Sequence, residues 1–314
     1  MSNTCFSVDV SDFDSDQDHV NGFHQAVKTI MEVDGKINFA DYFPWLKLFD
    51  PQGIRRDAKA AYGWLDQLRQ KFITQRLRHR ESNFPTHGDL LDSFLDFQQK
   101  NRSDFDIIHI KALLMDLFIA GTENISSTVE WAMSELILHQ NVMHKLCEEI
   151  SEKIGVRLKE AEILELPYLQ FVLKETMRFH LSVPLLLPHK SEINVKLNGY
   201  TIPKNTRVIV NAWTIARDAN SWKNPNHFTP ERFIGSEIDY RGQHFSFLPF
   251  GSGRRMCPGI RLAERVMSTM LVSLVAQFHW KLPNNMLPEE IDMDDTSGVT
   301  AQKATSLLLI PTTI

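Results

Sequence analysis

The residues with the clearest capacity for chemistry lie in one short segment, Phe250-Gly251-Ser252-Gly253-Arg254-Arg255-Met256-Cys257-Pro258-Gly259. Its glycines allow the backbone to pass close to a flat and bulky group, and Pro258 suits the first turn of a following helix. Cys257 then stands at a helix N-terminus beside Arg254 and Arg255. The helix dipole and the positive charges favour its thiolate form, which is a soft metal ligand.

Three interpretations of Cys257 are open at this point. A thiolate in a tight loop can ligate haem iron, where its electron density favours cleavage of a bound O–O bond, and the arginines could meet the haem carboxylates. Zinc is less suitable, because no second Cys or His stands at ligand spacing. A small core cysteine in a glycine-rich turn is the third. The remaining cysteines, Cys5 and Cys147, are far away in the chain, and this usage is typical of a reducing compartment.

A second group with possible chemistry is Ala120-Gly121-Thr122-Glu123-Asn124. Glu123 can transfer protons as a general acid or base, and Asn124 can donate a hydrogen bond or hold a water molecule. Gly121 taken alone is also typical of a helix-packing glycine. Two charged motifs follow, Glu175-Thr176-Met177-Arg178 and Pro230-Glu231-Arg232-Phe233. As an exposed (i, i+3) helix pair, the first would contribute only about 0.2–0.5 kcal/mol.

Helices must position most of these residues. Ser103 and Asp106 form a start similar to a capping box, and the apolar spacing that follows predicts one long helix over about 104–138. At about 1.5 Å per residue, such a helix crosses a whole domain. A second helix is predicted over about 168–180. A third follows Pro258 and has an apolar stripe on one face, made of Leu262, Ala263, Val266, Met267, Met270, Leu271, Leu274, Val275 and Phe278.

Strands are few and short. Residues 193–197 alternate in polarity, which predicts a strand. Asn198-Gly199 is the strongest short hairpin signal, and residues 200–202 are the predicted second strand of the hairpin. Residues 207–211 and 307–310 are further predicted strands. The sequence therefore predicts a mainly α chain with a small mixed β-sheet, and without a Pro/Gly/Ser linker we treat 1–314 as part of one domain.

The composition is that of a globular protein. The 314 residues include 34 Lys plus Arg against 39 Asp plus Glu, a net charge of −5, and 43% are apolar. Disorder, collagen and disulfide scaffolds are excluded, and no basic footprint for nucleic acid is present. No apolar run reaches the roughly 18–20 residues of a membrane span, and no signal peptide opens the sequence. The acidic start, from Asp9 to Asp18, lacks the Gly and Glu of a calcium loop.

The pattern Phe250, Gly253, Arg255, Cys257, Gly259 resembles the haem-binding signature of the cytochromes P450, the haem-thiolate monooxygenases. Three further motifs resemble that family and stand in its chain order. Residues 175–178 are similar to its helical E-x-x-R, residues 230–233 to its P-E-R-F, and residues 120–124 to its oxygen-activation segment. The resemblance implies a cytochrome P450 fold, with haem b as the cofactor and Cys257 as the axial ligand of its iron.

The resemblance also implies roles for particular residues. Asn124 occupies the place of the family's threonine in proton delivery, and His189 stands where an Arg often meets a haem propionate, although a core or surface histidine is equally compatible. The implied cofactor-binding residues are Cys257, Phe250, Gly253, Arg255, Gly259 and His189. The implied catalytic residues are Glu123, Asn124, Gly121 and Ala120. Glu175, Arg178 and Arg232 would form a buried structural network, and Phe118, Val183, Leu186 and Val299 would contact substrate, although each could equally be core packing.

Finer similarity indicates the plant branch that contains geraniol 8-hydroxylase and ferruginol synthase. It rests on residues 41–44, 50–56, 127–133 and 211–213. That branch implies oxidation of a mono- or diterpenoid with O2, using electrons from NADPH through cytochrome P450 reductase. It also implies residence on the cytosolic face of the endoplasmic reticulum membrane, or in solution if this shorter chain is the true product.

The resemblance covers only the C-terminal part of the family's chain, so we expect an N-terminally truncated fold without the membrane anchor. Two other functions stay open. A non-catalytic remnant would bind haem poorly, because apolar faces would lack the elements that cover them. A haem-thiolate isomerase or lyase would need no oxygen activation, which Asn124 favours.

Overall fold

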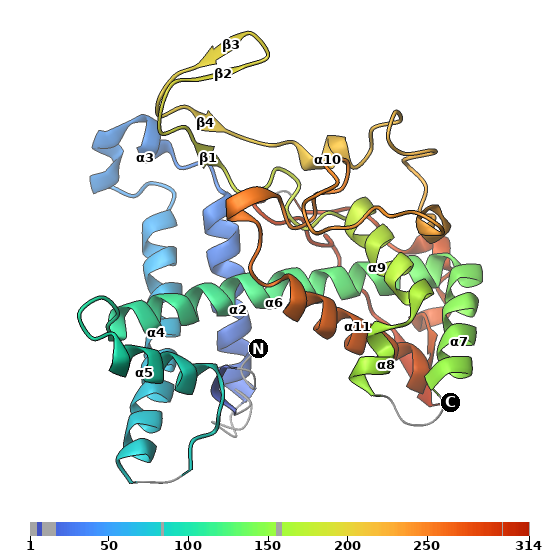
Figure 1. Cartoon of the computed structure of the whole chain (residues 1–314), viewed down its shortest axis with the longest axis horizontal. Coiled ribbons are helices and arrows are strands. Elements are labelled where there is room, and N and C mark those ends of the chain that lie inside the picture. The colour runs from blue at the N-terminus through green and yellow to red at the C-terminus, as the bar shows by residue number, and fades with distance from the viewer. Residues whose placement is uncertain (1–4, 8–16, 83–84, 155–158, 297, 314) are drawn as a thin grey trace. The chain divides into compact units, whose positions relative to one another are not determined.

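The computed structural model describes residues 5–7, 17–82, 85–154, 159–296 and 298–313 (Figure 1). Asp9 to Asp16 of the acidic start, and Ser297 in the predicted substrate segment, lie outside the described residues. The chain divides into two compact units, residues 1–123 and 124–314. The boundary falls inside the longest helix, α6 (Ile107–Leu138), so each unit receives part of that helix.

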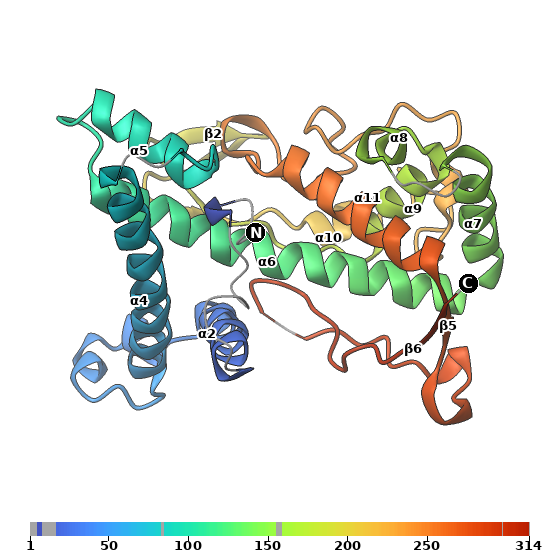
Figure 2. The ribbon, with the colours of Figure 1, turned by 90° about the horizontal axis from the view of Figure 1, so that it is seen from below.

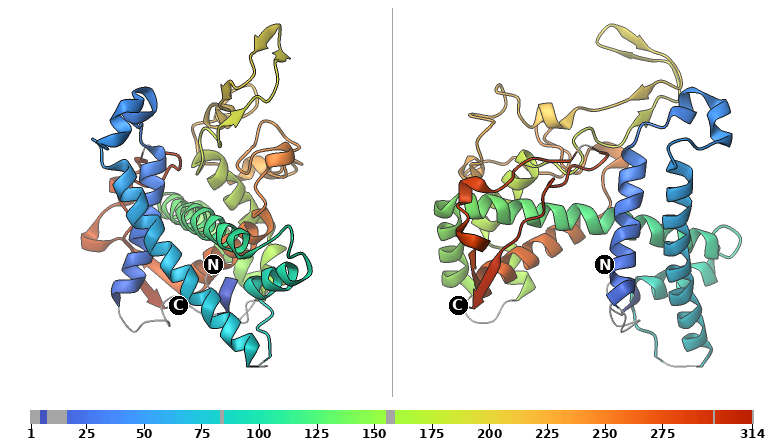
Figure 3. Two further views of the ribbon diagram at one scale, coloured as in Figure 1. Left: turned by 90° about the vertical axis from the view of Figure 1, so that its left-hand side faces the viewer. Right: turned by 180° about the vertical axis from the view of Figure 1, so that it is seen from behind.

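The first unit consists of helices joined by short loops, and its described residues contain no strand. Besides the start of α6, it contains α2 (Gln17–Gly35), α3 (Phe39–Tyr42), η2 (Pro44–Leu48), α4 (Ile54–Glu81) and α5 (Leu90–Lys100). Helices α2 and α4 pack side by side (Figure 3). Their contact buries one apolar cluster, and α4, α5 and the start of α6 bury a second. Amphipathic helices of this kind gain most of their stability from burying one face.

A buried ion-pair network joins α4 to α5. Arg76 donates to both carboxylate oxygens of Asp89 at 2.7 Å and lies 3.0 Å from Asp92. Asp89 is also the N-cap of α5 and accepts a hydrogen bond from the Asp92 amide at 3.0 Å. One carboxylate therefore both starts a helix and neutralises a buried guanidinium.

The second unit is built around the C-terminal part of α6, as Figure 2 shows. Its other helices are α7 (Gln140–Ile154), α8 (Glu160–Leu164), α9 (Pro167–Phe179), α10 (Ala212–Ile215) and α11 (Ile260–Gln277), with short 3-10 turns η3 (Pro230–Phe233), η4 (Gly253–Arg255), η5 (Pro283–Asn285) and η6 (Pro288–Glu290). One apolar core joins α6, α7, α9 and α11. The mainly α class predicted from the sequence is confirmed.

The strands differ from the predicted mixed sheet, because those described form three antiparallel pairs. These pairs are β1 (His189–Lys190) with β4 (Arg207–Val208), β2 (Val195–Leu197) with β3 (Tyr200–Ile202), and β5 (Phe278–Lys281) with β6 (Ile310–Thr313). The β2–β3 hairpin turns at Asn198-Gly199 as predicted. A parallel pair would need a crossover connection, whereas a tight turn can join only antiparallel strands.

The third predicted helix corresponds to α11, with one correction at its end. Helix α11 stops at Gln277, and Phe278 is extended and begins β5, so its ring does not belong to the helical stripe. The fully buried face of α11 includes Ala263, Met267 and Leu271, whereas Met270 is 40% exposed. The apolar pattern of the sequence is compatible with either a helix or a strand at this position. It therefore does not reveal where α11 ends and β5 begins. Among the described residues, no helix is long and apolar enough to cross a membrane.

Candidate functional site

The cysteine segment forms a tight loop directly before α11. The Cys257 amide donates to the Phe250 carbonyl at 3.0 Å, which closes the loop, and the Met256 amide donates to the Gly253 carbonyl at 3.1 Å. Gly251 and Gly253 have φ values of 72° and 76°, in the left-handed region that side chains with a Cβ avoid. The glycine spacing of the sequence therefore shapes the loop.

Cys257 differs from the other two cysteines in its surroundings. Its thiol is exposed and forms no disulfide, whereas Cys5 is buried and Cys147 is half-buried. Burial raises the pKa of both the Cys5 and the Cys147 thiols, which disfavours their thiolate forms. The interpretation of Cys257 as a small core residue is therefore wrong. An accessible sulfur at the start of α11 suits the thiolate ligand of a haem.

The other predicted cofactor residues lie on this loop, except His189, which lies on strand β1. Phe250 is half-buried, and its ring meets Tyr240 edge-on at 5.4 Å between centroids. Gly253 and Arg255 are exposed on the loop, and Gly259 is the N-cap of α11. His189 is exposed on strand β1, so of the two plain alternatives for it the structure favours a surface histidine over a core one.

The charged motifs form a buried network between α9 and η3. Arg178 donates to the two carboxylate oxygens of Glu175 at 2.7 and 2.8 Å, and Arg232 donates to Glu175 at 2.9 Å. Both partners of the first pair are fully buried, so the interpretation as an exposed helix pair is wrong. Arg178 also donates to three backbone carbonyls, which satisfies its remaining donors. This satisfaction is what makes a buried charge tolerable.

The predicted oxygen-activation residues follow one another along α6. Ala120 is exposed, Gly121 and Asn124 are half-buried, and Glu123 is buried. The Thr128 hydroxyl donates to the Asn124 carbonyl at 2.7 Å, one turn further along. Phe118, predicted to touch substrate, is buried in the apolar core of the first unit, 5.3 Å from the Phe6 ring.

The predicted substrate segments of the second unit lie together. The Ala301 amide donates to the Ser182 carbonyl at 2.8 Å, and the Ser182 hydroxyl lies 3.2 Å from that of Thr128 on α6. Val183 and Val299, next to these contacts, are half-buried. Leu186 reaches the cysteine loop, because a Cβ placed on Gly251 would lie 4.0 Å from its Cδ1. The fold therefore brings residues 128, 182 and 301 together, and it brings Leu186 beside the loop.

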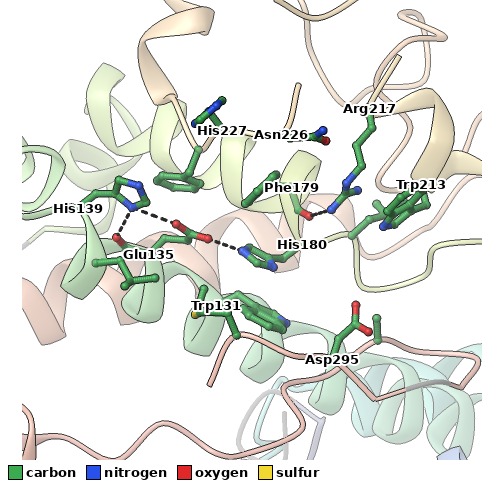
Figure 4. Close-up of a pocket in the computed structure, with 15 residues that line it drawn as sticks. Trp131, Glu135, His139, Phe179, His180, Trp213, Arg217, Asn226, His227 and Asp295 are labelled. Atoms are coloured by element: carbon green, nitrogen blue, oxygen red, sulfur yellow. Dashed lines mark hydrogen bonds and ion pairs between the residues drawn. The ribbon is translucent and has the colours of Figure 1, made fainter. Parts of the chain in front are cut away.

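The sequence analysis missed a polar cluster that lines a separate pocket (Figure 4). His180 Nε2 lies 2.6 Å from Glu135 Oε1, and His139 Nδ1 lies 3.1 Å from Glu135 Oε2. Burial raises the pKa of the Glu135 carboxyl, but its interactions with His139 and His180 outweigh this effect and hold that pKa below its usual value. The (i, i+4) spacing of Glu135 and His139 was a signal for this pair, whereas His180 joins only through the tertiary fold.

Comparison with known proteins identifies the class to which this fold and loop belong. The model of the family "Cytochrome P450" matches residues 1–309, so the chain belongs to the cytochrome P450 family. It is 42% identical to cytochrome P450 76T24 of Catharanthus roseus over 99% of this chain and 62% of that protein. It is also 42% identical to geraniol 8-hydroxylase of Catharanthus roseus, over 100% of this chain and 64% of that protein.

A third relative, carnosic acid synthase of Salvia fruticosa, is 42% identical over 99% of this chain and 63% of its own length. The chain therefore spans less than two thirds of the length of the curated relatives it matches. The predicted similarity to the plant branch that contains geraniol 8-hydroxylase is confirmed.

Proposed function

We propose that this chain is the haem-ligating part of a monooxygenase that inserts one oxygen atom from O2 into a small apolar terpenoid. The observation that supports this proposal most directly is the glycine-shaped loop that presents an exposed Cys257 thiol at the start of α11. The relatives named geraniol 8-hydroxylase and carnosic acid synthase support a mono- or diterpenoid as the substrate class.

The residues present fit haem b. Cys257 offers the soft sulfur ligand, and Gly251 and Gly253 keep the loop backbone free of side chains. Phe250, Gly259, Arg255 and His189 are the other proposed contacts, with the exposed Arg255 guanidinium suited to a propionate. When bound, haem would supply the reductive activation of O2, and its electrons would come from NADPH through cytochrome P450 reductase.

The chain's own residues would handle protons and substrate. We assign Glu123 and Asn124 to proton delivery, with Ala120 and Gly121 as the small residues that leave space beside them. Val183, Leu186 and Val299 are the proposed apolar contacts of the substrate, whereas Phe118 belongs to the core of the first unit. By the same family relationship, we propose that the protein acts on the cytosolic face of the endoplasmic reticulum membrane.

Haem ligation is tested by the absorption of the reduced protein under carbon monoxide. The unaltered chain, expressed with haem supplied, is expected to develop the red-shifted band of a thiolate-ligated haem. Cys257→Ala should lose this band entirely, and the matched control Cys147→Ala should keep it. Absence of the band from the unaltered chain would contradict the proposal and favour the non-catalytic remnant.

Asn124 favours a second candidate, a haem-thiolate isomerase or lyase, because an amide is not a hydroxyl in a proton relay. The reconstituted protein with reductase, NADPH and geraniol under labelled O2 separates the two. A monooxygenase incorporates one labelled atom, and Asn124→Thr should lower the share of electrons lost as hydrogen peroxide. An unlabelled rearranged product, formed without consumption of O2, would instead identify the isomerase.

A further inference from the structure

The second unit contains a pocket that is separate from the cysteine loop. Its volume is about 450 Å³, within the range of sites for small organic molecules. Its walls come from α6, the end of α9, α10 and the segment around residue 295, and none of residues 250–259 lines it. Figure 4 shows aromatic side chains, among them Trp131, Phe179 and Trp213, arranged around it.

Two lining residues of this pocket have incomplete bonding, the base Arg217 and the acid Glu135. One terminal nitrogen of Arg217, Nη2, donates to the Phe179 carbonyl, and the guanidinium lies 4.2 Å from the centre of the Trp213 ring. The other terminal nitrogen, Nη1, is buried and has no hydrogen-bond partner among the described residues. Buried charged donors are nearly always paired, so an orphaned one marks a place for an acceptor.

The acidic side chains that line the pocket do not accept a hydrogen bond from Arg217 Nη1. Glu135 Oε1 lies 2.6 Å from His180, and Glu135 Oε2, which is buried without a hydrogen bond, lies 3.1 Å from His139 as an ion-pair contact. Neither oxygen pairs with Arg217 in the described part of the chain. Asp295 is exposed at the rim and makes no ion pair with Arg217 in the described part of the chain. Burial and the nearby Arg178 together lower the pKa of Arg217 to about 10, so the guanidinium is still charged at neutral pH.

We propose that this pocket binds a small carboxylate that has a planar apolar body. The carboxylate accepts a hydrogen bond from Arg217 Nη1, and the apolar body lies against the aromatic side chains of Phe179 and Trp213. A guanidinium prefers carboxylates to other acceptors for its planar geometry and its charge. The exposed carboxylate of Asp295 at the rim weakens binding by repulsion.

The test is a calorimetric titration of the whole chain with benzoate, and with benzamide as the neutral molecule of the same shape. Benzoate is expected to bind saturably and at least tenfold more tightly than benzamide. Arg217→Met should weaken benzoate binding at least tenfold and leave benzamide unchanged. The matched control Arg265→Met removes an exposed arginine that pairs with Glu160 outside the pocket, and it should have no effect.

If Arg217→Met does not fold, Asp295→Asn still tests the proposal. Residue 295 is exposed, so this substitution should not disturb folding. This variant should bind benzoate more tightly, and added salt should weaken binding in every variant that keeps Arg217. Equal affinity for benzoate and benzamide, or no saturable binding of benzoate, would overturn the proposal. Cys257→Ala should bind benzoate normally, so the outcome does not depend on the haem experiment.

Discussion

At the scale of single residues, exposure separates the reactive side chains from the structural ones. Of the three cysteines, Cys257 is the exposed one, which suits a ligand. Glu175 is the opposite case, a carboxylate with no exposed surface that is held by two arginines and by the Thr229 amide. Its charge is tolerated only because every partner is in place.

The Glu175 network leads to a stability prediction. Glu175→Gln should lower the free energy of unfolding by about 3–5 kcal/mol, because Arg178 and Arg232 would be left buried with no neutralising carboxylate. Urea unfolding followed by circular dichroism measures the change. The control Glu162→Gln alters an exposed carboxylate paired with Lys159 and should shift stability by less than about 1 kcal/mol. Equal effects of the two variants would contradict the network's role.

At the scale of elements, hydrogen bonds to carboxylates fix the residues at which two helices begin. Helix α5 starts at the Asp89 cap that also binds Arg76. Helix α9 starts at Pro167, and the Glu149 carboxylate accepts from the first free amides there at 2.9 and 3.0 Å. A carboxylate in this position satisfies orphaned donors and complements the helix dipole.

The Asp89 cap gives a prediction for α5. Asp89→Ala removes the cap and the bidentate partner of Arg76, so the first unit should lose at least about 2 kcal/mol. Hydrogen exchange of the whole chain, read by mass spectrometry, should show faster exchange over residues 89–100. Asp104→Ala, an exposed position after α5, is the matched control and should leave exchange there unchanged. Slow exchange retained in Asp89→Ala would show that the apolar face alone holds α5.

At the scale of the whole molecule, both units depend on buried or half-buried carboxylates that are ionised in the folded state. In each case burial raises the carboxyl pKa, but hydrogen bonds from basic or hydroxyl partners outweigh it, so the folded pKa lies below the ordinary value. These carboxylates are Asp89 and Asp92 in the first unit and Glu135 and Glu231 in the second. Acid should therefore weaken both units together.

The sign follows from proton linkage. A carboxyl with a lowered folded pKa contributes stability above its unfolded pKa and loses it as the pH falls through the folded pKa. The urea midpoint should therefore decrease as the pH is lowered from about 5 to about 3, below the ordinary carboxyl values of about 4. Parallel unfolding curves at several pH values measure this change. A midpoint that stays constant over that range would contradict the proposed contribution of these carboxylates.

The sequence by itself determined the family, the helical class and the identity of the candidate ligand. These follow from local patterns, since glycine spacing, apolar periodicity and the Asn198-Gly199 turn act between near neighbours in the chain. Local patterns failed at Phe278, where a helix passes directly into a strand that β6 must pair. Pairing with a distant segment leaves no signal in either segment alone.

Only the tertiary structure decided the exposure of Cys257, the burial of Glu175 with Arg178, and the pocket around Arg217. Each depends on what distant segments place next to a side chain. Arg217, for instance, lies near Phe179 of α9 and in a pocket lined by Glu135 of α6. Burial and charge pairing arise from the sum of such contacts, and they set the pKa and binding capacity of a side chain more strongly than its neighbours in sequence.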